Sequence, residues 1–290
     1  MKNVDLKNEN PNFGNVLLPA VLSLFDGMSC GQIALERAGI KYNEYYASEI
    51  DKHAIRVAVN NYPKTKQIGS VTEVIAENLP KIELLMGGSP CQGFSTAGKE
   101  LNFNDERSKL FFEFVRLKNE LNPKYWLLEN VSMKKEFRDI ISKILGYEPT
   151  MINSSLLSGQ NRPRYYWTNI SFNLPNDKKI SASDVLKIPD AKIGQPQPYP
   201  RNYKELGLKR FERIEYRTDG KSNAIITNSK KNLLKLDDGY RKLTPNECEK
   251  LQTVPLNYTN CVNDTQRYRM LGNGWTVDVI AHILSFIPQS

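Results

Sequence analysis

Short apolar runs alternate with amphipathic segments in the first half of this 290-residue chain. The apolar runs have the length of buried strands, and the segments between them carry apolar residues at helical spacing. Strands that alternate with helices favour an α/β fold with a doubly wound, mostly parallel sheet. The expected strands are Val21–Phe25, Glu44–Ser48, Leu84–Met86 and Tyr125–Leu128, and the expected helices are Gln32–Ala38, Lys52–Asn60, Leu110–Leu121 and Lys134–Leu145.

The residue pattern of the chain changes after about residue 170. Residues 172–240 carry scattered Pro and Gly and few long apolar periods, and residues 201–242 hold twelve Lys or Arg against six Asp or Glu. Residues 277–287 return to apolar helical spacing, which predicts a helix that packs back on the first part. We therefore predict a larger domain of residues 1–171 plus 262–290, and a smaller basic domain of residues 172–261.

Composition narrows the compartment and the partners. The net charge of +8 favours an acidic partner, nucleic acid first. The four cysteines (Cys30, Cys91, Cys248 and Cys261) form no C-x-x-C pair, which argues against a structural zinc site and fits a reducing compartment. The apolar run 16–25 is too short to span a membrane. We expect a cytoplasmic protein without metal or membrane contact, with residues 1–15 as a leader.

A glycine-containing turn follows the first expected strand. Phe25–Gly31 reads FDGMSCG, and Glu49 stands at the end of the second strand. Glycines there allow a tight turn close to a ligand, and an acid at the second strand's end typically accepts hydrogen bonds from a ribose. An ordinary strand-to-helix turn explains the glycines equally well. If a ligand binds, the absence of G-x-G-x-x-G spacing and of a Walker lysine favours a nucleoside without phosphates, such as S-adenosylmethionine.

Two polar residues follow other apolar runs, and a polar segment precedes a further one, Tyr165–Thr168. Cys91 comes directly after Pro90, just past Leu84–Met86, and Glu129 follows Tyr125–Leu128. Both positions fall at the carboxyl edge of the expected sheet, where open α/β folds bind ligands. Alternation in residues 160–164 (QNRPR) places Gln160, Arg162 and Arg164 on one face of an extended segment. Taken singly, an inert thiol, a paired carboxylate and a solvated edge strand are the competing interpretations.

Six motifs in order make the chain resemble the DNA (cytosine-5) methyltransferases, from about Val21 to Ile287. The loop Phe25–Gly31 resembles the family's cofactor loop, and Gly88-Ser-Pro-Cys-Gln92 its nucleophile motif. The remaining four are Glu129-Asn-Val131, Gln160-x-Arg162-x-Arg164, Arg241-Lys-Leu-Thr-Pro-Asn-Glu247 with Leu251-Gln252, and Gly272-Asn-Gly-Trp-Thr-Val277. Trp275 and the short recognition region look closest to the catalytic domain of the animal de novo enzymes, although a bacterial or phage member is expected.

The resemblance implies an S-adenosylmethionine-dependent methyltransferase fold with a target recognition domain, and a role for each motif. The implied catalytic residues are Cys91, Glu129, Arg162 and Arg164. The implied cofactor contacts are Phe25, Asp26, Gly27, Met28, Gly31, Glu49, Ile50, Ser70, Val71, Ser89, Pro90, Leu110, Asn273, Gly274 and Trp275. The implied substrate contacts are Ser95, Gln160, Thr218, Ser222 and Asn223, the last three in an expected base-reading loop of residues 218–229. Ser70 stands where the family usually has an acid that contacts the adenine of the cofactor.

The implied reaction is transfer of a methyl group to C5 of cytosine in a specific duplex DNA sequence, with a flipped base and a covalent Cys91–C6 adduct. A cognate restriction endonuclease is an implied partner, and the enzyme is expected as a monomer or homodimer. A tRNA cytosine-5 methyltransferase shares these motifs and remains an alternative. A catalytically silent DNA-binding protein on the same fold is a second one, and a thiol oxidoreductase, which would lack a resolving cysteine near Cys91, is a third.

Overall fold

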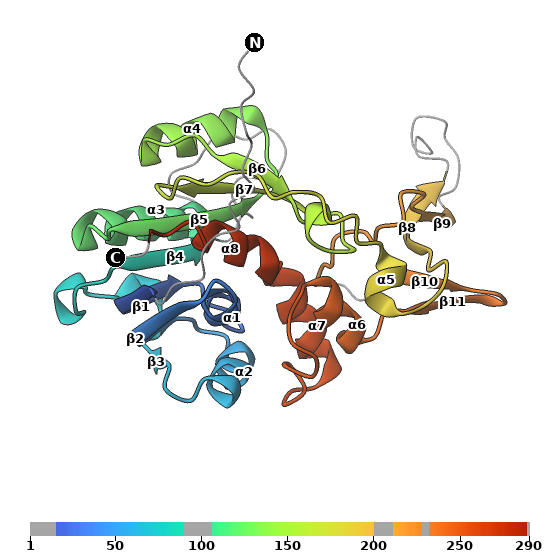
Figure 1. Ribbon diagram of the computed structural model, residues 1–290, viewed down its shortest axis with the longest axis horizontal. Coiled ribbons are helices and arrows are strands. Elements are labelled where there is room, and N and C mark those ends of the chain that lie inside the picture. Colours follow the sequence, from blue (N-terminus) through green and yellow to red (C-terminus); the bar gives the residue numbers. More distant parts are fainter. Residues whose placement is uncertain (1–15, 90–105, 200–210, 228–231, 289–290) are drawn as a thin grey trace, which may run out of the picture.

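Two sheets lie at opposite ends of the molecule (Figure 1). The computed structural model describes residues 16–89, 106–199, 211–227 and 232–288. Three predicted site residues, Pro90, Cys91 and Ser95, lie outside the described residues. Within the described ranges, none of the helices combines the length and apolar character needed to cross a bilayer.

The large sheet has seven strands in the order β3-β2-β1-β4-β5-β7-β6. The pairs are parallel except those that β7 forms with β5 and β6, which are antiparallel. This arrangement confirms the predicted mostly parallel α/β sheet. The strands are β1 (Val16–Leu24), β2 (Ile40–Ser48), β3 (Lys66–Gln67), β4 (Leu84–Gly88), β5 (Tyr125–Val131), β6 (Thr150–Asn153) and β7 (Pro163–Thr168).

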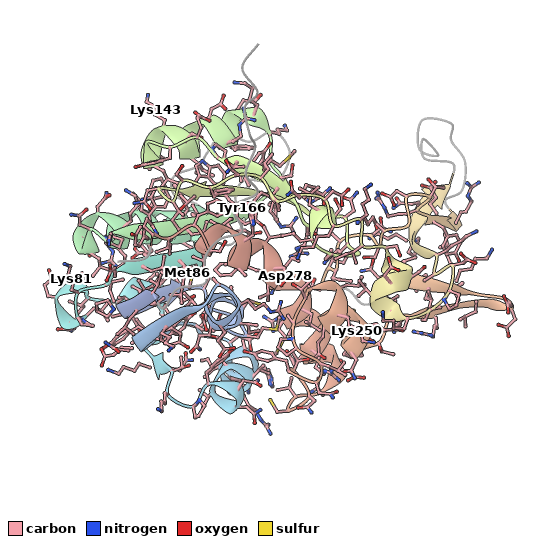
Figure 2. All side chains as sticks on the ribbon, viewed as in Figure 1. Lys81, Met86, Lys143, Tyr166, Lys250 and Asp278 are labelled. Atoms are coloured by element: carbon pink, nitrogen blue, oxygen red, sulfur yellow. The ribbon has the colours of Figure 1, made fainter. Side chains whose placement is uncertain are left out.

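Alternate side chains of the central strands enter two separate apolar clusters, one on each face of the large sheet. Met86 and Leu127 belong to one cluster, and their neighbours Leu85 and Leu128 belong to the other. Met86 and Tyr166 lie within the sheet in Figure 2, whereas the exposed Lys81 lies at its periphery. Burial on both faces explains why these strands read as unbroken apolar runs rather than alternating ones.

Helices cover both faces. Apolar residues of α1 (Cys30–Arg37), α2 (Lys52–Asn61) and α8 (Val277–Leu284) join the first cluster. Those of α3 (Glu106–Leu121) and α4 (Lys135–Leu145) join the second. Each expected strand and helix of the first half therefore exists, with boundaries shifted by a few residues. One shift matters for the site, because Glu129 lies within β5 rather than after it.

The small sheet is antiparallel and has the order β11-β10-β8-β9. Its strands are β8 (Ile193–Tyr199), β9 (Phe211–Tyr216), β10 (Leu233–Leu236) and β11 (Gly239–Lys242), and α5 (Ala182–Leu186) precedes them. Between the two sheets lie α6 (Pro245–Leu251) and α7 (Asp264–Asn273) (Figure 1). Three short 3-10 helices complete the elements: η1 (Val71–Glu73), η2 (Ala76–Asn78) and η3 (Ser154–Leu156).

The first apolar cluster extends from the large sheet into the small one. It continues from α8 through Leu251 of α6 and Leu271 of α7 to Ile225 and Leu234. The two sheets therefore share apolar packing, and the domain boundaries expected from the sequence stay a prediction.

Candidate active site

A cavity of about 470 Å³ opens at the carboxyl ends of β1, β2, β4 and β5. Its wall is built from the turns that follow these strands, from α7 and from the turn between α7 and α8. The predicted residues that line it are Phe25, Asp26, Gly27, Met28, Glu49, Ile50, Ser70, Val71, Ser89, Leu110, Glu129, Arg162, Arg164, Asn273, Gly274 and Trp275. The structure thus brings together most of the site expected from the sequence, at the sheet edge where α/β folds bind ligands.

The turn between β1 and α1 is held by the carboxylate of Glu49. Oε2 of Glu49 accepts the backbone N–H of Gly27 at 2.8 Å, and Oε1 accepts those of Ile50 and Asp51 at 2.7 and 2.8 Å. Gly27 has a φ of 58°, a left-handed backbone conformation that favours glycine. Glu49 therefore fixes the two turns that form one wall of the cavity.

Asp26 places a buried carboxylate in the same wall. Its Oδ1 accepts the hydroxyl of Tyr45 at 2.8 Å, whereas its Oδ2 is buried without a hydrogen-bond partner among the described residues. Burial raises the pKa of Asp26 to about 6. A cationic or N–H donor on a ligand would satisfy Oδ2 and favour the ionised carboxylate.

The side of the cavity next to β2 is more open. Ile50 lines it with 76% of its surface exposed, which leaves an apolar face free at the cavity. Ser70 begins η1, where its hydroxyl accepts the backbone N–H of Thr72 at 3.3 Å and lies 2.8 Å from the Thr72 hydroxyl. Ser70 is half-buried and lines the cavity.

The turn between α7 and α8 closes the cavity from the C-terminal side. A Cβ on Gly88 would lie 2.8 Å from Nε1 of Trp275 and 3.2 Å from Oε2 of Glu129, so glycine is needed where these side chains approach β4. Gly31, in contrast, does not line the cavity. A Cβ there would lie 2.7 Å from the hydroxyl of Tyr45 and 2.9 Å from Cε of Met86, which makes Gly31 a packing position beneath the turn.

Glu129 on β5 and Arg164 on β7 form a largely buried ion pair in the wall. Nε of Arg164 lies 3.0 Å from Oε1 of Glu129, and both side chains are less than one-sixth exposed. The antiparallel pairing of β5 with β7 places Arg164 opposite Val131, two residues along from Glu129. The pair presents a carboxylate and a guanidinium side by side, which suits recognition of a planar, hydrogen-bonding ligand.

Asn130, which is not among the residues expected from the sequence, ties β5 to the end of β4. Its Nδ2 donates to Oγ of Ser89 at 3.1 Å and to the Ser89 carbonyl at 3.4 Å, and Asn130 is fully buried. Ser89 is two residues before Cys91. Asn130 therefore fixes the point from which the chain leads to the predicted nucleophile.

Arg162 has different partners from Arg164. Its guanidinium donates to the carbonyls of Ile225 at 2.6 Å and of Gly272 and Gly274 at 3.0 Å each. Burial lowers the pKa of Arg162 to about 9, and the nearby Arg164 adds to this effect. Arg162 thus contacts the backbone of three residues, and its predicted catalytic role stays a prediction.

Gln160 and Ser222, two of the predicted substrate contacts, lie in the interior. Gln160 Nε2 donates to the Leu251 carbonyl and to Oε1 of Gln252, both at 3.0 Å. Ser222 is fully buried and pairs with residues 159–161 through its backbone. Of the other expected base contacts, Thr218 is exposed and Asn223 is half-buried.

Two charged residues at the cavity were not indicated by any sequence motif. Arg269 of α7 and Asp51 at the start of α2 both line it, and NH1 of Arg269 lies 3.3 Å from Oδ2 of Asp51. Charged surface residues are common in any sequence, so no sequence signal distinguishes these two. Only the fold shows that they form an ion pair at the cavity.

Comparison with known proteins finds relatives that match nearly the whole chain. Residues 20–198 and 200–289 match the family described as C-5 cytosine-specific DNA methylase. The chain is 29% identical over 306 residues to the Type II methyltransferase M1.ScrFI of Lactococcus lactis subsp. cremoris, which covers 90% of this chain and 75% of the relative. It is 30% identical over 284 residues to the orphan methyltransferase M.SPRI of Bacillus phage SPR, which covers 89% of this chain and 61% of the relative.

Solved structures agree on the fold. A DNA modification methyltransferase encoded within a prophage of E. coli has 22% identity and a TM-score of 0.64, over 93% of this chain and 98% of its own. The methyltransferase EhMeth of Entamoeba histolytica has 17% identity and a TM-score of 0.70, over 92% and 97%. These two identities are low enough that the likeness concerns the fold alone.

The curated relatives also correct one expectation. They are bacterial and phage enzymes of the type II and orphan classes, so the expected special likeness to animal de novo methyltransferases is wrong. Trp275 and a short recognition region misled because both features also suit a compact bacterial or phage enzyme. From its motifs, its fold and its match over nearly the whole length, the chain belongs to the family of C-5 cytosine-specific DNA methylases.

Proposed function

We propose that this enzyme transfers a methyl group from S-adenosylmethionine to C5 of a cytosine flipped out of a specific duplex DNA sequence, through a covalent bond between Cys91 and C6. The observation that carries the proposal is a single cavity that both reactants would share. It holds the Glu129–Arg164 pair and the chain leading to Cys91 on one side, and the Asp26–Glu49 turns on the other. Adjacent subsites are what a transfer between two bound molecules requires.

The cavity wall fits S-adenosylmethionine. The partnerless Oδ2 of Asp26 suits its amino group, and the exposed face of Ile50 suits the adenine ring. Glu49 already accepts three backbone N–H groups, so we assign it chiefly to holding the turns, with any remaining lone pair available to a ribose hydroxyl. When bound, the cofactor supplies an electrophilic methyl group.

The chain's own residues activate the cytosine. C5 is a weak nucleophile, so the Cys91 thiolate first adds to C6 and the electron pair of the 5,6 double bond moves toward C5 and the ring. Glu129 hydrogen-bonds N3 and the exocyclic amine, and Arg164, held beside it at 3.0 Å, orients the carboxyl group and offsets negative charge. C5 accepts the methyl group, a base then removes the C5 proton, and the returning electron pair expels the Cys91 thiolate.

The small sheet and the loops around it are proposed to bind the duplex. Residues 201–242 carry an excess of Lys and Arg, and phosphate contacts of that kind make binding fall as the salt concentration rises. A stacked cytosine hides C6, so the base must leave the helix before Cys91 can reach it. We propose residues 1–171 plus 262–290 as the catalytic domain and residues 172–261 as the target recognition domain.

Bisulfite sequencing of DNA from a methylation-free host that expresses the protein tests the proposal directly. We expect one short sequence to carry 5-methylcytosine, and no methylation in the same host with Cys91→Ala. Methylation by Cys91→Ala at the level of the native protein would contradict the adduct. A native protein that methylates tRNA but leaves duplex DNA unmodified in a parallel assay would instead support the tRNA alternative.

A further inference from the structure

Three short segments from distant parts of the chain meet at one place, which we call the joint: residues 159–162, 222–227 and 272–274. The first two run side by side. Ser222 donates its backbone N–H to the Gly159 carbonyl at 2.7 Å, and Asn161 donates to the Ser222 carbonyl at 2.9 Å. Ile225, three residues on, is bound at both its backbone groups by the same segment. Its N–H donates to Oε1 of Gln160 at 2.7 Å, and its carbonyl accepts from Arg162 at 2.6 Å.

The third segment lies directly against the second. A Cβ on Gly272 would lie 2.2 Å from the backbone nitrogen of Thr227 and 2.3 Å from the carbonyl carbon of Ile226. Real Cβ contacts of that length do not occur, so only glycine allows residues 226–227 to cross the end of α7. A shift of this crossing segment toward α7 must displace Gly272 because protein interiors are close-packed.

Gln252 adds a second connection. Its Nε2 donates to the carbonyls of Leu271 at 2.6 Å and Gly274 at 3.1 Å, and its Oε1 accepts from Gln160 at 3.0 Å. Gln160 and Gln252 are both fully buried. A continuous set of hydrogen bonds therefore runs from Ile225 through the two glutamines to the cavity wall at Gly274.

Arg162 makes the shortest connection across the joint. It is 3% exposed, and it forms no ion pair with any carboxylate in the described ranges. A buried cation is costly unless its donors are used. The donors of Arg162 are used on Ile225 on one side and on Gly272 and Gly274 on the other, and both glycines line the cofactor cavity. Its planar fork spans two segments at fixed angles, which a lysine ammonium cannot do.

We propose that Arg162 is a positioning residue that couples the binding of target DNA to the binding of cofactor. This inference rests on the proposed function, in which residues 218–229 approach the DNA and Asn273–Trp275 contact the cofactor. DNA that draws residues 222–227 into one arrangement then also fixes the wall at Gly272–Gly274. By reciprocity, the cofactor favours the same arrangement for DNA.

Isothermal titration of S-adenosylhomocysteine, with and without a duplex that carries the site mapped by bisulfite sequencing, measures the coupling. For the native protein we expect the duplex to tighten cofactor binding about tenfold. Arg162→Lys, which keeps the charge, should bring this ratio to within about twofold of unity. The matched control is Arg116→Lys, because Arg116 also donates to two backbone carbonyls, Val71 and Val74, but has no contact with the joint. Arg116→Lys should keep the native ratio.

A ratio that is near unity in the native protein, or unchanged by Arg162→Lys, would overturn the inference even where the enzyme methylates DNA normally. Failure to bind cofactor or to methylate any DNA would remove the proposed function as well, so the two failures are distinguishable. If Arg162→Lys does not fold, hydrogen exchange of the native protein decides. S-adenosylhomocysteine alone should slow exchange at the amides of residues 225–227, and unchanged exchange there would also overturn the inference.

Discussion

The large sheet and the region around the small sheet are held together by different means. Central strands of the large sheet bury apolar side chains on both faces, as Leu85 and Met86 do in adjacent positions. Around the small sheet, apolar packing is supplemented by polar side chains that donate to backbone carbonyls. Lys221, for example, donates to the carbonyls of Ser155, Ser158 and Ile180 at 2.6 to 3.1 Å, in addition to the contacts of Arg162.

The two kinds of stabilisation suit two different tasks. Apolar burial on both faces makes a rigid support for groups that must be placed accurately, such as Glu129 on β5. Directed hydrogen bonds hold the segments of the small region on a defined course, which would leave their outer side chains free for the proposed contact with DNA. The large sheet is thus expected to govern chemistry and the small region to govern target binding, with the joint connecting them.

The largest expected effect separates chemistry from DNA binding. Cys91→Ser should lower methyl transfer by about four orders of magnitude or more, because a serine hydroxyl at neutral pH is a far weaker nucleophile than a thiolate. Radiolabelled methyl transfer measures the rate, and gel shift measures DNA affinity, which should stay near native. A parallel loss of DNA affinity would break the proposed division of tasks.

Glu129→Gln should lower kcat by about 10²- to 10⁴-fold, since an amide cannot exchange a proton with N3 of cytosine. The Arg164 contact at 3.0 Å can persist with the amide oxygen, so the melting temperature should change little. Steady-state kinetics with saturating cofactor give the rate. A kcat within twofold of native would exclude Glu129 from the chemical step.

Gly272→Ala tests the joint through stability. The added methyl group would overlap the backbone of residues 226–227, and we expect a loss of about 3 kcal/mol in the free energy of unfolding. Gly146→Ala is the control, because its side chain meets open space and only the left-handed φ of 73° is strained, at a cost of about 1 kcal/mol. Urea unfolding followed by circular dichroism compares them, and equal losses would argue against close packing at the joint.

Asp26→Asn should change how stability depends on pH. The folded-state pKa of about 6 exceeds the ordinary value, so the native protein holds this proton more tightly. The contribution of Asp26 to stability is therefore fully present below about pH 4 and is lost as the pH rises through about 6. The amide that replaces the carboxyl group cannot titrate, so the stability of the variant relative to native should rise by about 2 kcal/mol between pH 4 and pH 7. A constant difference in urea unfolding across that range would contradict a raised pKa.

The smallest effect concerns the mouth of the cavity. Asp51→Asn removes the ion pair with Arg269 but keeps a side-chain oxygen to accept the His53 N–H at the start of α2. Exposed pairs contribute little, so we expect less than about 1 kcal/mol in unfolding and at most about a fivefold change in S-adenosylhomocysteine affinity. Isothermal titration checks the affinity. A change above about thirtyfold would show that the pair retains the cofactor directly.

The same contrast explains which parts the sequence could predict. Strands β4 and β5 could be predicted from the sequence because a strand that is buried on both faces needs an unbroken apolar run. Strand β8 was not, because Pro196 and Pro198 interrupt it and prolines lack the N–H that a central strand needs. The structure accommodates them since β8 pairs with β10 only at Ile193 and Gly194, before the prolines, and with β9 along the rest.

The site shows a similar limit. The motifs pointed to Glu129, Arg164 and the turns after β1 and β2, and the structure brings these residues around one cavity at the sheet edge. Alternation could not distinguish Arg162 from Arg164, because two arginines on one face of a segment reach different partners only after residues 222–227 and 272–274 come together. The packing role of Gly31 in α1 likewise depends on Tyr45 and Met86, which lie on β2 and β4.

The cavity wall draws on both ends of the described chain. The Tyr258 hydroxyl donates to the carbonyl of Met28, 230 residues away, and Trp275 lines the same cavity as Asp26. A ribosome therefore has to deliver the chain through Trp275 before the cavity can exist, while every strand of both sheets has already emerged. A premature stop early in α7 would remove Gly272–Gly274, Trp275 and α8, and with them part of the joint, one wall of the cavity and part of the first apolar cluster.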